Sequence, residues 1–410
     1  MAPLDATLAR LHRQHYREIL APLIRVLGSF ELAEEVVQDA FVQAMAAWKD
    51  ELPDEPLAWL KRVAKNRAID QHRRAGRWRD RERVLAETEP RAFEASFDAE
   101  ALPDDELRLI FTCCHPALAP EARIALTLRT VCGLTSDEVA RAFLLKTTTL
   151  QQRLVRAQKK IDAAGIPYVI PDRSEIPERL DSVLRTIYLV FNEGYGATEG
   201  DVLVRRELCD EAIRLARLVC SLVPDTSASL GLLALLLLHH SRRDARVDAR
   251  GELVTLEDQD RTRWDRALID EALPLVDAAL RARPVATYAI EAAISALHAR
   301  AATPDATDWP QIVQLYGALY ERSNGNPVVA LNAAVARAMA GEPDEALATL
   351  DALDVGGLLA GYHLLPAARA ELLRRAERLD EARAAYDAAL SLVTNPVERR
   401  HLERRRASLA

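Results

Sequence analysis

The stretch LTSDEVARAFLLKTTTLQQRLVRAQKKI, residues 134–161, contains the strongest local structural signal in the chain. Thr135 is followed three residues later by Glu138, and this spacing forms a capping box. In a capping box the hydroxyl accepts from the backbone N–H of the glutamate, while the carboxylate reaches back to the backbone N–H of the cap. The stretch therefore predicts a helix that begins at Ser136 and ends at Phe143.

A tight turn and a second helix follow in the sequence. The turn is Leu144-Leu145-Lys146, Thr147 is the expected N-cap, and the helix extends to about Ile161. Two helices joined by a tight turn are typical of helix-turn-helix DNA-binding domains. We assign this predicted domain to residues 105–164.

The predicted second helix is amphipathic. Its apolar residues share one face and should be buried: Leu150, Leu154, Ala157 and Ile161. Glutamine and arginine pair bidentately with adenine and guanine edges in the major groove, which the N-terminal half of a recognition helix enters. We therefore expect the opposite face, which includes Thr148, to contact duplex DNA: base edges through Gln151, Gln152 and Arg156, an apolar contact through Val155, and phosphates through Arg153, Lys159 and Lys160. The alternative is a polar face of a protein-interaction domain.

The charge is distributed in a way that suits a nucleic-acid-binding protein, although the net charge is −8. Basic residues dominate from Lys61 to Arg83 and again from Arg153 to Lys160, and acidic residues dominate elsewhere. Local polarity of this kind, more than net charge, determines contact with phosphates.

Composition predicts a protein of several all-α domains. The 410 residues suggest two to four domains, and few aromatic residues with much Ala, Leu, Arg and Glu favour helix. Five cysteines without metal-ligand spacing favour a reduced, cytoplasmic compartment. The longest apolar run, Leu230–Leu238, is too short to span a membrane, and the N-terminus lacks signal-peptide features. We expect no metal, no cofactor and no catalysis by this chain.

Prolines and charge mark the domain boundaries. Residues 5–83 form a first helical block, in which the loop Asp50–Pro56 precedes a third helix from about Leu57 to Arg74. Residues 84–104 form an acidic linker, and residues 165–177 form a proline-rich linker. Residues 178–410 form a third, helical region. Within it, acidic residues around Arg261 and Arg263 suggest a surface ion-pair network.

The C-terminal region contains a repeat. The segment 341–350 recurs as 377–386, an offset of 36 residues, and each copy follows an Ala- and Leu-rich helix, about Val328–Met339 and about Tyr362–Ala376. The offset is close to that of the tetratricopeptide repeat (TPR), whose helix pairs stack into a solenoid with a concave binding surface. Alanine-rich helical hairpins can also resemble one another through composition alone.

Several motifs together resemble extracytoplasmic-function (ECF) sigma factors of RNA polymerase. The first two are EEVVQDAF, residues 34–41, and AWLKRVAKNRAID, residues 58–70; the later ones are LTSDEVA, residues 134–140, and QRLVRA, residues 152–157. The segments YLVFNEGY, residues 188–195, and LEDQDRTRWD, residues 256–265, are similar to the subgroup with a large TPR-like C-terminal extension.

The resemblance implies an alternative sigma factor and a role for each motif. Helix 36–41 would bind the clamp of the largest subunit of core RNA polymerase, through Val36, Gln38, Asp39 and Phe41. The third helix would bind the melted −10 element, through Trp59, Arg62, Asn66, Arg67, Asp70, Arg73 and Arg74. The helix-turn-helix would bind duplex DNA at −35. The extension would regulate the sigma factor in cis and respond to a protein or small-molecule signal.

One alternative belongs to a different class of protein. A helix-turn-helix activator with a TPR-type sensor domain, which is not a polymerase subunit, accounts for residues 105–410 equally well. It leaves the helical block 5–83 without a function, so we favour the sigma factor.

Overall fold

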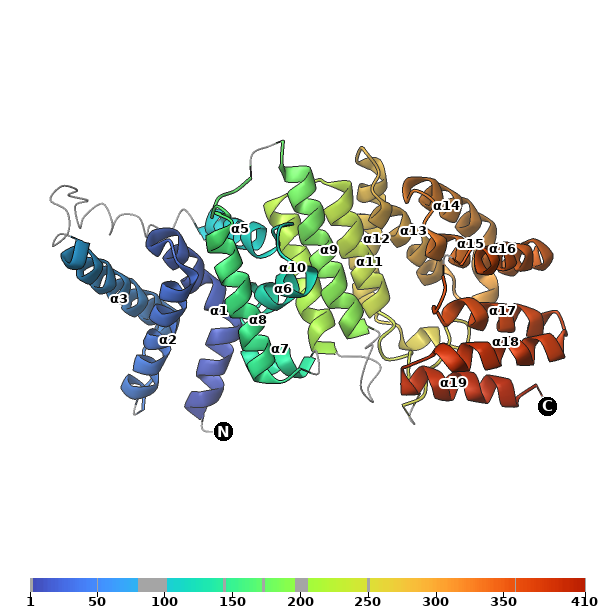
Figure 1. Cartoon of the computed structure of the whole chain (residues 1–410), viewed down its shortest axis with the longest axis horizontal. Helices are drawn as coiled ribbons and strands as arrows, with labels where there is room; N and C mark the ends of the chain where they lie inside the picture. Colours follow the sequence, from blue (N-terminus) through green and yellow to red (C-terminus); the bar gives the residue numbers. More distant parts are fainter. Residues whose placement is uncertain are drawn as a thin grey trace. The chain divides into compact units, whose positions relative to one another are not determined.

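The computed structural model describes residues 3–49, 51–79, 102–142, 145–171, 174–195, 206–248, 251–357 and 359–409. The predicted linker 84–104 lies outside these residues up to position 101. The described residues form helices, and the only extended pairing among them is an isolated bridge between Val247 and Leu253. The all-α prediction is confirmed. The chain divides into two compact units, Met1–Ile187 and Tyr188–Ala410 (Figure 1).

The first unit contains two groups of helices. The N-terminal group is α1 (Pro3–Leu27), α2 (Phe30–Ala47) and α3 (Pro56–Arg79). The second group is α5 (Leu102–Cys113), α6 (Pro120–Leu126), the π-helical turn η2 (Thr127–Val131), α7 (Ser136–Ala142) and α8 (Thr147–Ala163). Helix α9 (Ile176–Tyr195) crosses the boundary between the two units.

The start of α3 differs from the prediction. Pro56 is the first residue of this helix and not the last residue of the loop. The first turn of a helix tolerates proline because its N–H groups have no intrahelical partner, and the fixed φ of proline suits the helix.

A buried carboxylate joins the two helix groups of the first unit. Asp105 of α5 is fully buried, and it accepts from Arg25 of α1 at 2.8 Å and from Arg108 at 2.6 Å. The Tyr168 hydroxyl lies 3.0 Å from the backbone oxygen of Asp105. A buried charge requires such partners, so these bonds fix α5 against α1.

The second unit is built from helices throughout. After α9 these are α10 (Arg206–Leu222), α11 (Ser227–His240), η3 (Arg261–Arg263), α12 (Arg266–Arg281), α13 (Thr287–Arg300), η4 (Pro304–Ala306), α14 (Trp309–Arg322), α15 (Pro327–Met339), α16 (Pro343–Val355), α17 (Leu364–Arg375), α18 (Leu379–Leu392) and α19 (Pro396–Ala407).

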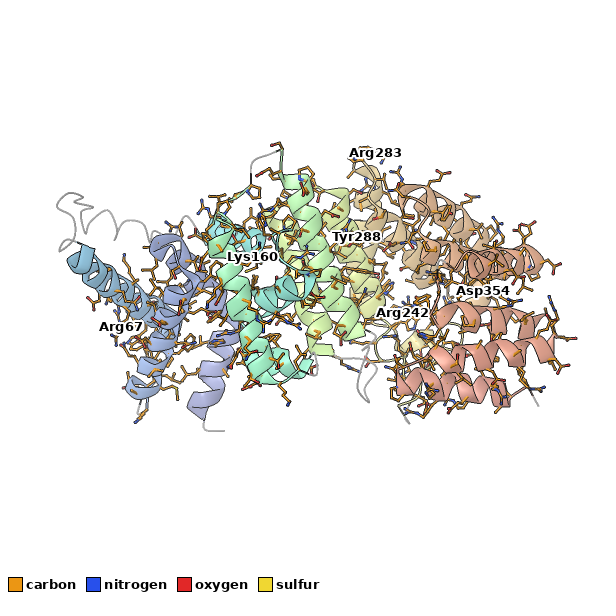
Figure 2. All side chains as sticks on the ribbon, in the orientation of Figure 1. Arg67, Lys160, Arg242, Arg283, Tyr288 and Asp354 are labelled. Carbon is orange, nitrogen blue, oxygen red and sulfur yellow. The ribbon has the colours of Figure 1, made fainter. Side chains whose placement is uncertain are left out.

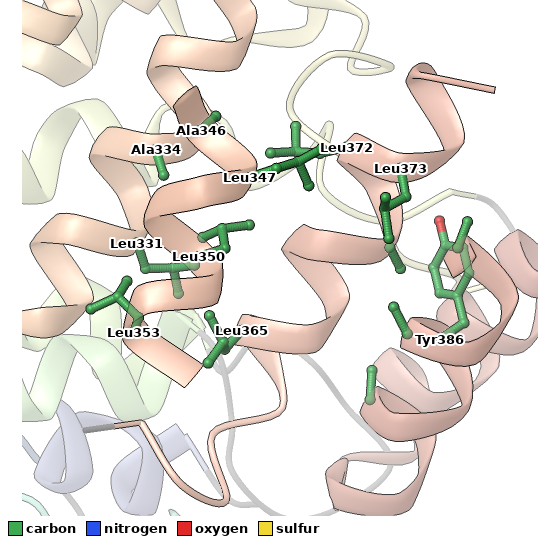
Figure 3. Packing of buried hydrophobic residues seen from close by; sticks show 14 of the residues in the cluster. Leu331, Ala334, Ala346, Leu347, Leu350, Leu353, Leu365, Leu372, Leu373 and Tyr386 are labelled. Atoms are coloured by element: carbon green, nitrogen blue, oxygen red, sulfur yellow. The ribbon is translucent and has the colours of Figure 1, made fainter. Parts of the chain in front are cut away.

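The predicted repeat corresponds to two helix pairs, α15–α16 and α17–α18. The second helices of the pairs begin at 343 and 379, which preserves the offset of 36 residues. Gly341 and Glu377 occupy equivalent positions in the two turns, with φ of 101° and 58°. Both turns therefore place a residue in the left-handed region, which costs glycine little and glutamate more. Buried leucines of α15, α16 and α17 and Tyr386 of α18 form a common core (Figure 3).

Two acidic residues of the segment 256–265 form ion pairs, Glu257 with Arg375 and Asp265 with Arg243, whereas Arg261 has a different role from the predicted surface ion-pair network. Arg261 is 7% exposed, and its guanidinium donates to the backbone oxygens of His298 at 2.7 Å and Ala301. It thus satisfies carbonyl groups at the C-terminal end of α13, which have no partner within the helix. The carboxylate of Asp265 caps α12 and pairs with Arg243 at 2.7 Å.

Candidate nucleic-acid interface

The α7–α8 pair has the local geometry that its sequence predicts. The Thr135 hydroxyl accepts from the N–H of Glu138 at 3.2 Å, and the Glu138 carboxylate accepts from the N–H of Thr135 at 2.8 Å. This reciprocal capping box satisfies donors at the start of α7 that lack intrahelical partners. The end predicted for this helix, Phe143, lies outside the described residues, as does Leu144 of the turn.

The predicted cap of α8 is wrong. The N-cap is Lys146, and Thr147 is the first helical residue. The Thr147 hydroxyl donates instead to the Asp137 carboxylate of α7 at 2.7 Å. Because this bond connects the two helices, Thr147 fixes the angle of the turn, a role that capping preferences do not reveal.

The apolar face of α8 is buried as predicted, at Leu150, Leu154, Ala157 and Ile161. The opposite face is exposed at most of the positions predicted to contact duplex DNA: Thr148, Gln151, Gln152, Val155, Arg156, Lys159 and Lys160, with Arg153 half-buried. Val155 is 48% exposed, which leaves an apolar side chain available to a partner. The face therefore combines groups that recognise base edges with groups that bind phosphate.

The cations of this face are not neutralised within the described part of the chain. No described carboxylate forms an ion pair with Arg153, Arg156, Lys159 or Lys160. Lys160 is labelled on α8 in Figure 2. Free cations on one helix face can replace the counterions of a DNA backbone.

Helix α3 presents a second polar face. Arg62, Asn66 and Asp70 are separated by four residues each and are all exposed, so they form one stripe along the helix. Trp59 is half-buried against Trp48, the C-cap of α2, with ring centroids 5.2 Å apart. For Arg73 and Arg74, the backbone lies in α3 and the side chains lie outside what the structure describes.

Arg67 is oriented toward α2. Its Nε lies 4.0 Å from the Asp39 carboxylate, so the residue predicted to bind DNA pairs with one predicted to bind polymerase. Arg67 is labelled in Figure 2. Both side chains are more than one third exposed. An exposed pair at this distance contributes little to stability and leaves both groups available to other partners.

The predicted polymerase-binding residues of α2 do not all reach the surface. Val36 is fully buried and cannot contact a partner directly in this structure; it packs α2 into the helix bundle. Gln38 and Asp39 are exposed, and the half-buried Phe41 ring lies 5.2 Å from the His12 ring. The exposed part of the predicted site is therefore polar. The helical period places Val36 on the same face as the buried Ala33 and Ala40, which could have identified it as a core residue.

Two polar residues of this region were missed from the sequence. Thr149 is exposed beside Thr148 in the first turn of α8, where a hydroxyl can donate to a phosphate. Gln158 of α8 donates to Glu34 of α2 at 3.2 Å. The run of three threonines could have indicated the first residue, but no local signal predicts the second, which depends on tertiary packing.

The cysteines and other potential metal ligands do not form a chemical site among the described residues. Cys113 and Cys114 are buried, and burial raises the pKa of both thiols. The described residues contain no group of three or more potential metal ligands. No helix among them has both the length and the apolar character needed to cross a membrane.

The exposed polar helix of a helix-turn-helix, next to a separate helical bundle with a polar stripe, defines a DNA-binding transcription protein. Residues 11–78 match sigma-70 region 2, and residues 108–161 match sigma-70 region 4. Residues 179–280 match a family of unknown function, DUF6596. The two sigma-70 regions coincide with the helix groups of the first unit.

Known proteins resemble both the whole chain and its N-terminal part. An uncharacterized protein of Rhizobium meliloti (strain 1021) is 45% identical over 93% of this chain and 90% of its own length. The probable ECF RNA polymerase sigma factor SigI of Mycobacterium tuberculosis (strain H37Rv) is 27% identical over 38% of this chain and 54% of its own length. RNA polymerase sigma-H factor of Pseudomonas aeruginosa is 29% identical over 38% of this chain and 83% of its own length.

A solved TPR protein from Thermus thermophilus has 17% identity and a TM-score of 0.25, covering 71% of this chain and 98% of its own. The chain belongs to the ECF sigma factor family, and its second unit is a large C-terminal helical extension. It is an alternative sigma factor.

Proposed function

We propose that this chain binds core RNA polymerase and directs transcription initiation at specific −35/−10 promoters, in the cytoplasm and without catalysis of its own. The observation that carries the proposal is the exposed face of α8. It offers Gln151, Gln152 and Arg156 to base edges, above an apolar face that fixes the helix in its domain. We assign α8 to the major groove at −35, with Arg153, Lys159 and Lys160 on phosphates.

The stripe on α3 suits the melted −10 element. A base removed from the stack requires hydrogen-bonding groups, and the displaced backbone requires cations. Asn66 and Asp70 supply the first, and Arg62 supplies the second on the same exposed face. Gln38 and Asp39 then provide the polar part of a contact with the polymerase clamp.

We propose that the second unit regulates this activity in cis. Its stacked helix pairs are a common architecture for binding other molecules. A protein or small-molecule signal bound there would alter how the first unit engages polymerase or promoter DNA.

In vitro transcription from pooled promoter DNA tests the proposal, with core RNA polymerase and either the full chain or residues 1–195. The shorter chain retains α9 because Arg179 of this helix donates to the Phe111 backbone oxygen at 2.9 Å in the first unit. Specific initiation with core enzyme alone supports the proposal, and a difference between the two chains gives the sign of the regulation.

The activator hypothesis predicts another result. Neither chain would then start transcription with core enzyme, but the full chain would bind duplex DNA and stimulate a holoenzyme that already contains a sigma factor. Nothing in the geometry of α1–α3 favours this outcome, because an activator needs no second DNA-binding stripe.

A further inference from the structure

The second unit contains a cavity of 370 Å³ between α15, α17, α19 and the segment 253–257. Its apolar lining includes Leu253, Leu331, Val335, Met339, Leu364 and Leu402. Cavities of this size and character bind small molecules, with a few polar groups that orient the ligand. Neither the family assignment nor the proposed promoter contacts account for it.

The sequence of α17 explains why this space is not filled. Leu364 and Leu372 line the cavity two helical turns apart, while Ala367 and Ala368 occupy the turn between them. A larger side chain at these alanines would extend into the cavity. Leu331 and Leu372 are seen in the adjoining core in Figure 3.

Two side-chain pairs connect α17 and α19 across the cavity. At their N-terminal ends, His363 Nε2 lies 3.2 Å from Glu398 Oε2. Two turns further along both helices, Arg405 Nη2 lies 3.4 Å from Glu371 Oε1. The cavity therefore has charged side chains at both ends, and leucines, Val335 and Met339 supply most of its apolar lining.

The end near Arg405 carries an excess of positive charge. Glu371 accepts from Arg374 at 2.6 Å and from Arg375 at 3.2 Å, and Arg375 also pairs with Glu257. At this end of the cavity three arginines therefore share two carboxylates. Arg374 is not itself a lining residue, and the third carboxylate of the lining, Glu398, lies beside His363 at the opposite end.

Arg405 is the least committed of these arginines. The long contact with Glu371 is its only ion pair with a described residue, and its side chain is 30% exposed. Burial raises the pKa of Glu371, but its hydrogen bond from Arg374 and the charge of Arg405 lower it further, so this carboxylate stays ionised. His401, one turn before Arg405, is also in the lining, and burial lowers its pKa, which leaves it neutral.

We propose that this cavity binds a small amphipathic monocarboxylate, whose apolar body lies among the leucines and whose carboxylate pairs with Arg405. At this end three arginines face two carboxylates, which favours a negatively charged group there, and guanidinium–carboxylate hydrogen bonds are among the stronger ones in proteins. The binding site stands on its own geometry; its role as the signal that regulates transcription rests on the proposed function.

Isothermal titration calorimetry on the full chain tests the site, with sodium octanoate and with 1-octanol as the uncharged analogue of the same length. We expect octanoate to bind about tenfold more tightly than octanol, a difference of about 1.4 kcal/mol. Arg405→Gln should abolish this preference. Arg404→Gln is the matched control, because Arg404 pairs with Glu252 and does not line the cavity.

A second variant tests the location. Ala368→Leu should weaken the binding of both compounds by filling the cavity, while Ala384→Leu, at an exposed position of α18, should leave it unchanged. Thermal unfolding checks that each variant is folded. The proposal is overturned if octanoate shows no saturable binding, if octanol binds equally well, or if Arg405→Gln retains the preference. A chain that binds octanoate but does not initiate transcription would instead contradict the proposed function alone.

Discussion

Arg156 is the residue for which direct base recognition can be tested most sharply. Its side chain is exposed on α8 and has no ion-pair partner among the described residues. We predict that Arg156→Ala weakens binding to −35 DNA by about 1–3 kcal/mol and relaxes sequence preference at one position. Fluorescence anisotropy with a panel of −35 DNA duplexes, each changed at a single base pair, measures both effects.

Lys160→Ala is the control for this prediction. Loss of a phosphate contact should weaken binding to all sequences alike and reduce its salt dependence. If Arg156→Ala also weakened all sequences equally, Arg156 would be a phosphate contact.

Glu291 of α13 should make stability depend on pH. Burial raises the pKa of this carboxyl from 4.5 to about 7. Between pH 4.5 and about 7, the folded state therefore keeps the Glu291 carboxyl protonated, whereas the unfolded state has released this proton. The contribution of Glu291 to stability is largest below pH 4.5 and is lost as pH rises to about 7.

We predict that Glu291→Gln removes this pH dependence. The variant should be more stable than the natural chain by about 2–3 kcal/mol at pH 8, with little difference near pH 4.5. Urea unfolding at both pH values measures this difference between the proteins. Comparing the variant with the natural chain cancels the pH-dependent contributions of other groups. One of these is His298: burial lowers its pKa to about 4, so its effect on stability has the opposite sign. An equal difference at both pH values would show that the carboxyl does not titrate in this range.

At the scale of the elements, the packing of α11 on α13 depends on one glycine. A Cβ at Gly231 would lie 2.5 Å from the backbone nitrogen of Ala289, so the helices approach too closely for any side chain. We predict that Gly231→Ala destabilises the second unit by about 1–3 kcal/mol, because backbone cannot move aside as a flexible side chain can. Thermal unfolding followed by circular dichroism measures the effect.

Gly317 of α14 supplies a matched control. A Cβ there meets nothing within 4 Å. Gly317→Ala should therefore be neutral or stabilise the chain by about 0.4–1 kcal/mol, since alanine restricts the unfolded chain. Equal destabilisation by both substitutions would indicate a general effect of alanine and not the close helix contact.

At the scale of the whole molecule, two compact units should unfold in separate steps. Each unit has its own buried core, with Leu60 in the first and Leu350 in the second. We predict two transitions in differential scanning calorimetry, because a chain with several domains does not follow two-state behaviour. Leu60→Ala should lower the temperature of one transition and Leu350→Ala that of the other. Each substitution should reduce the free energy of unfolding of its unit by the ~2–5 kcal/mol typical of a buried leucine. One transition that both variants lower equally would contradict independent units.

The sequence by itself determined the features that depend on a few neighbouring residues. The capping box at Thr135 and Glu138, the buried stripe of α8 and the 36-residue repeat all follow from local spacing, because hydrogen bonds and helical periodicity act over three or four residues. The same spacing separated the exposed face of α8 from its buried face, and with it most of the candidate −35 contacts.

The tertiary structure decided what depends on residues far apart in the chain. Thr147 bonds Asp137 and does not cap α8, and Gln158 of α8 bonds Glu34 of α2. The cavity unites segments near residues 255, 335, 368 and 401, whose meeting depends on how whole helices stack. The lining of the cavity and the charge around Arg405 arise only after that stacking, so no local pattern encodes them.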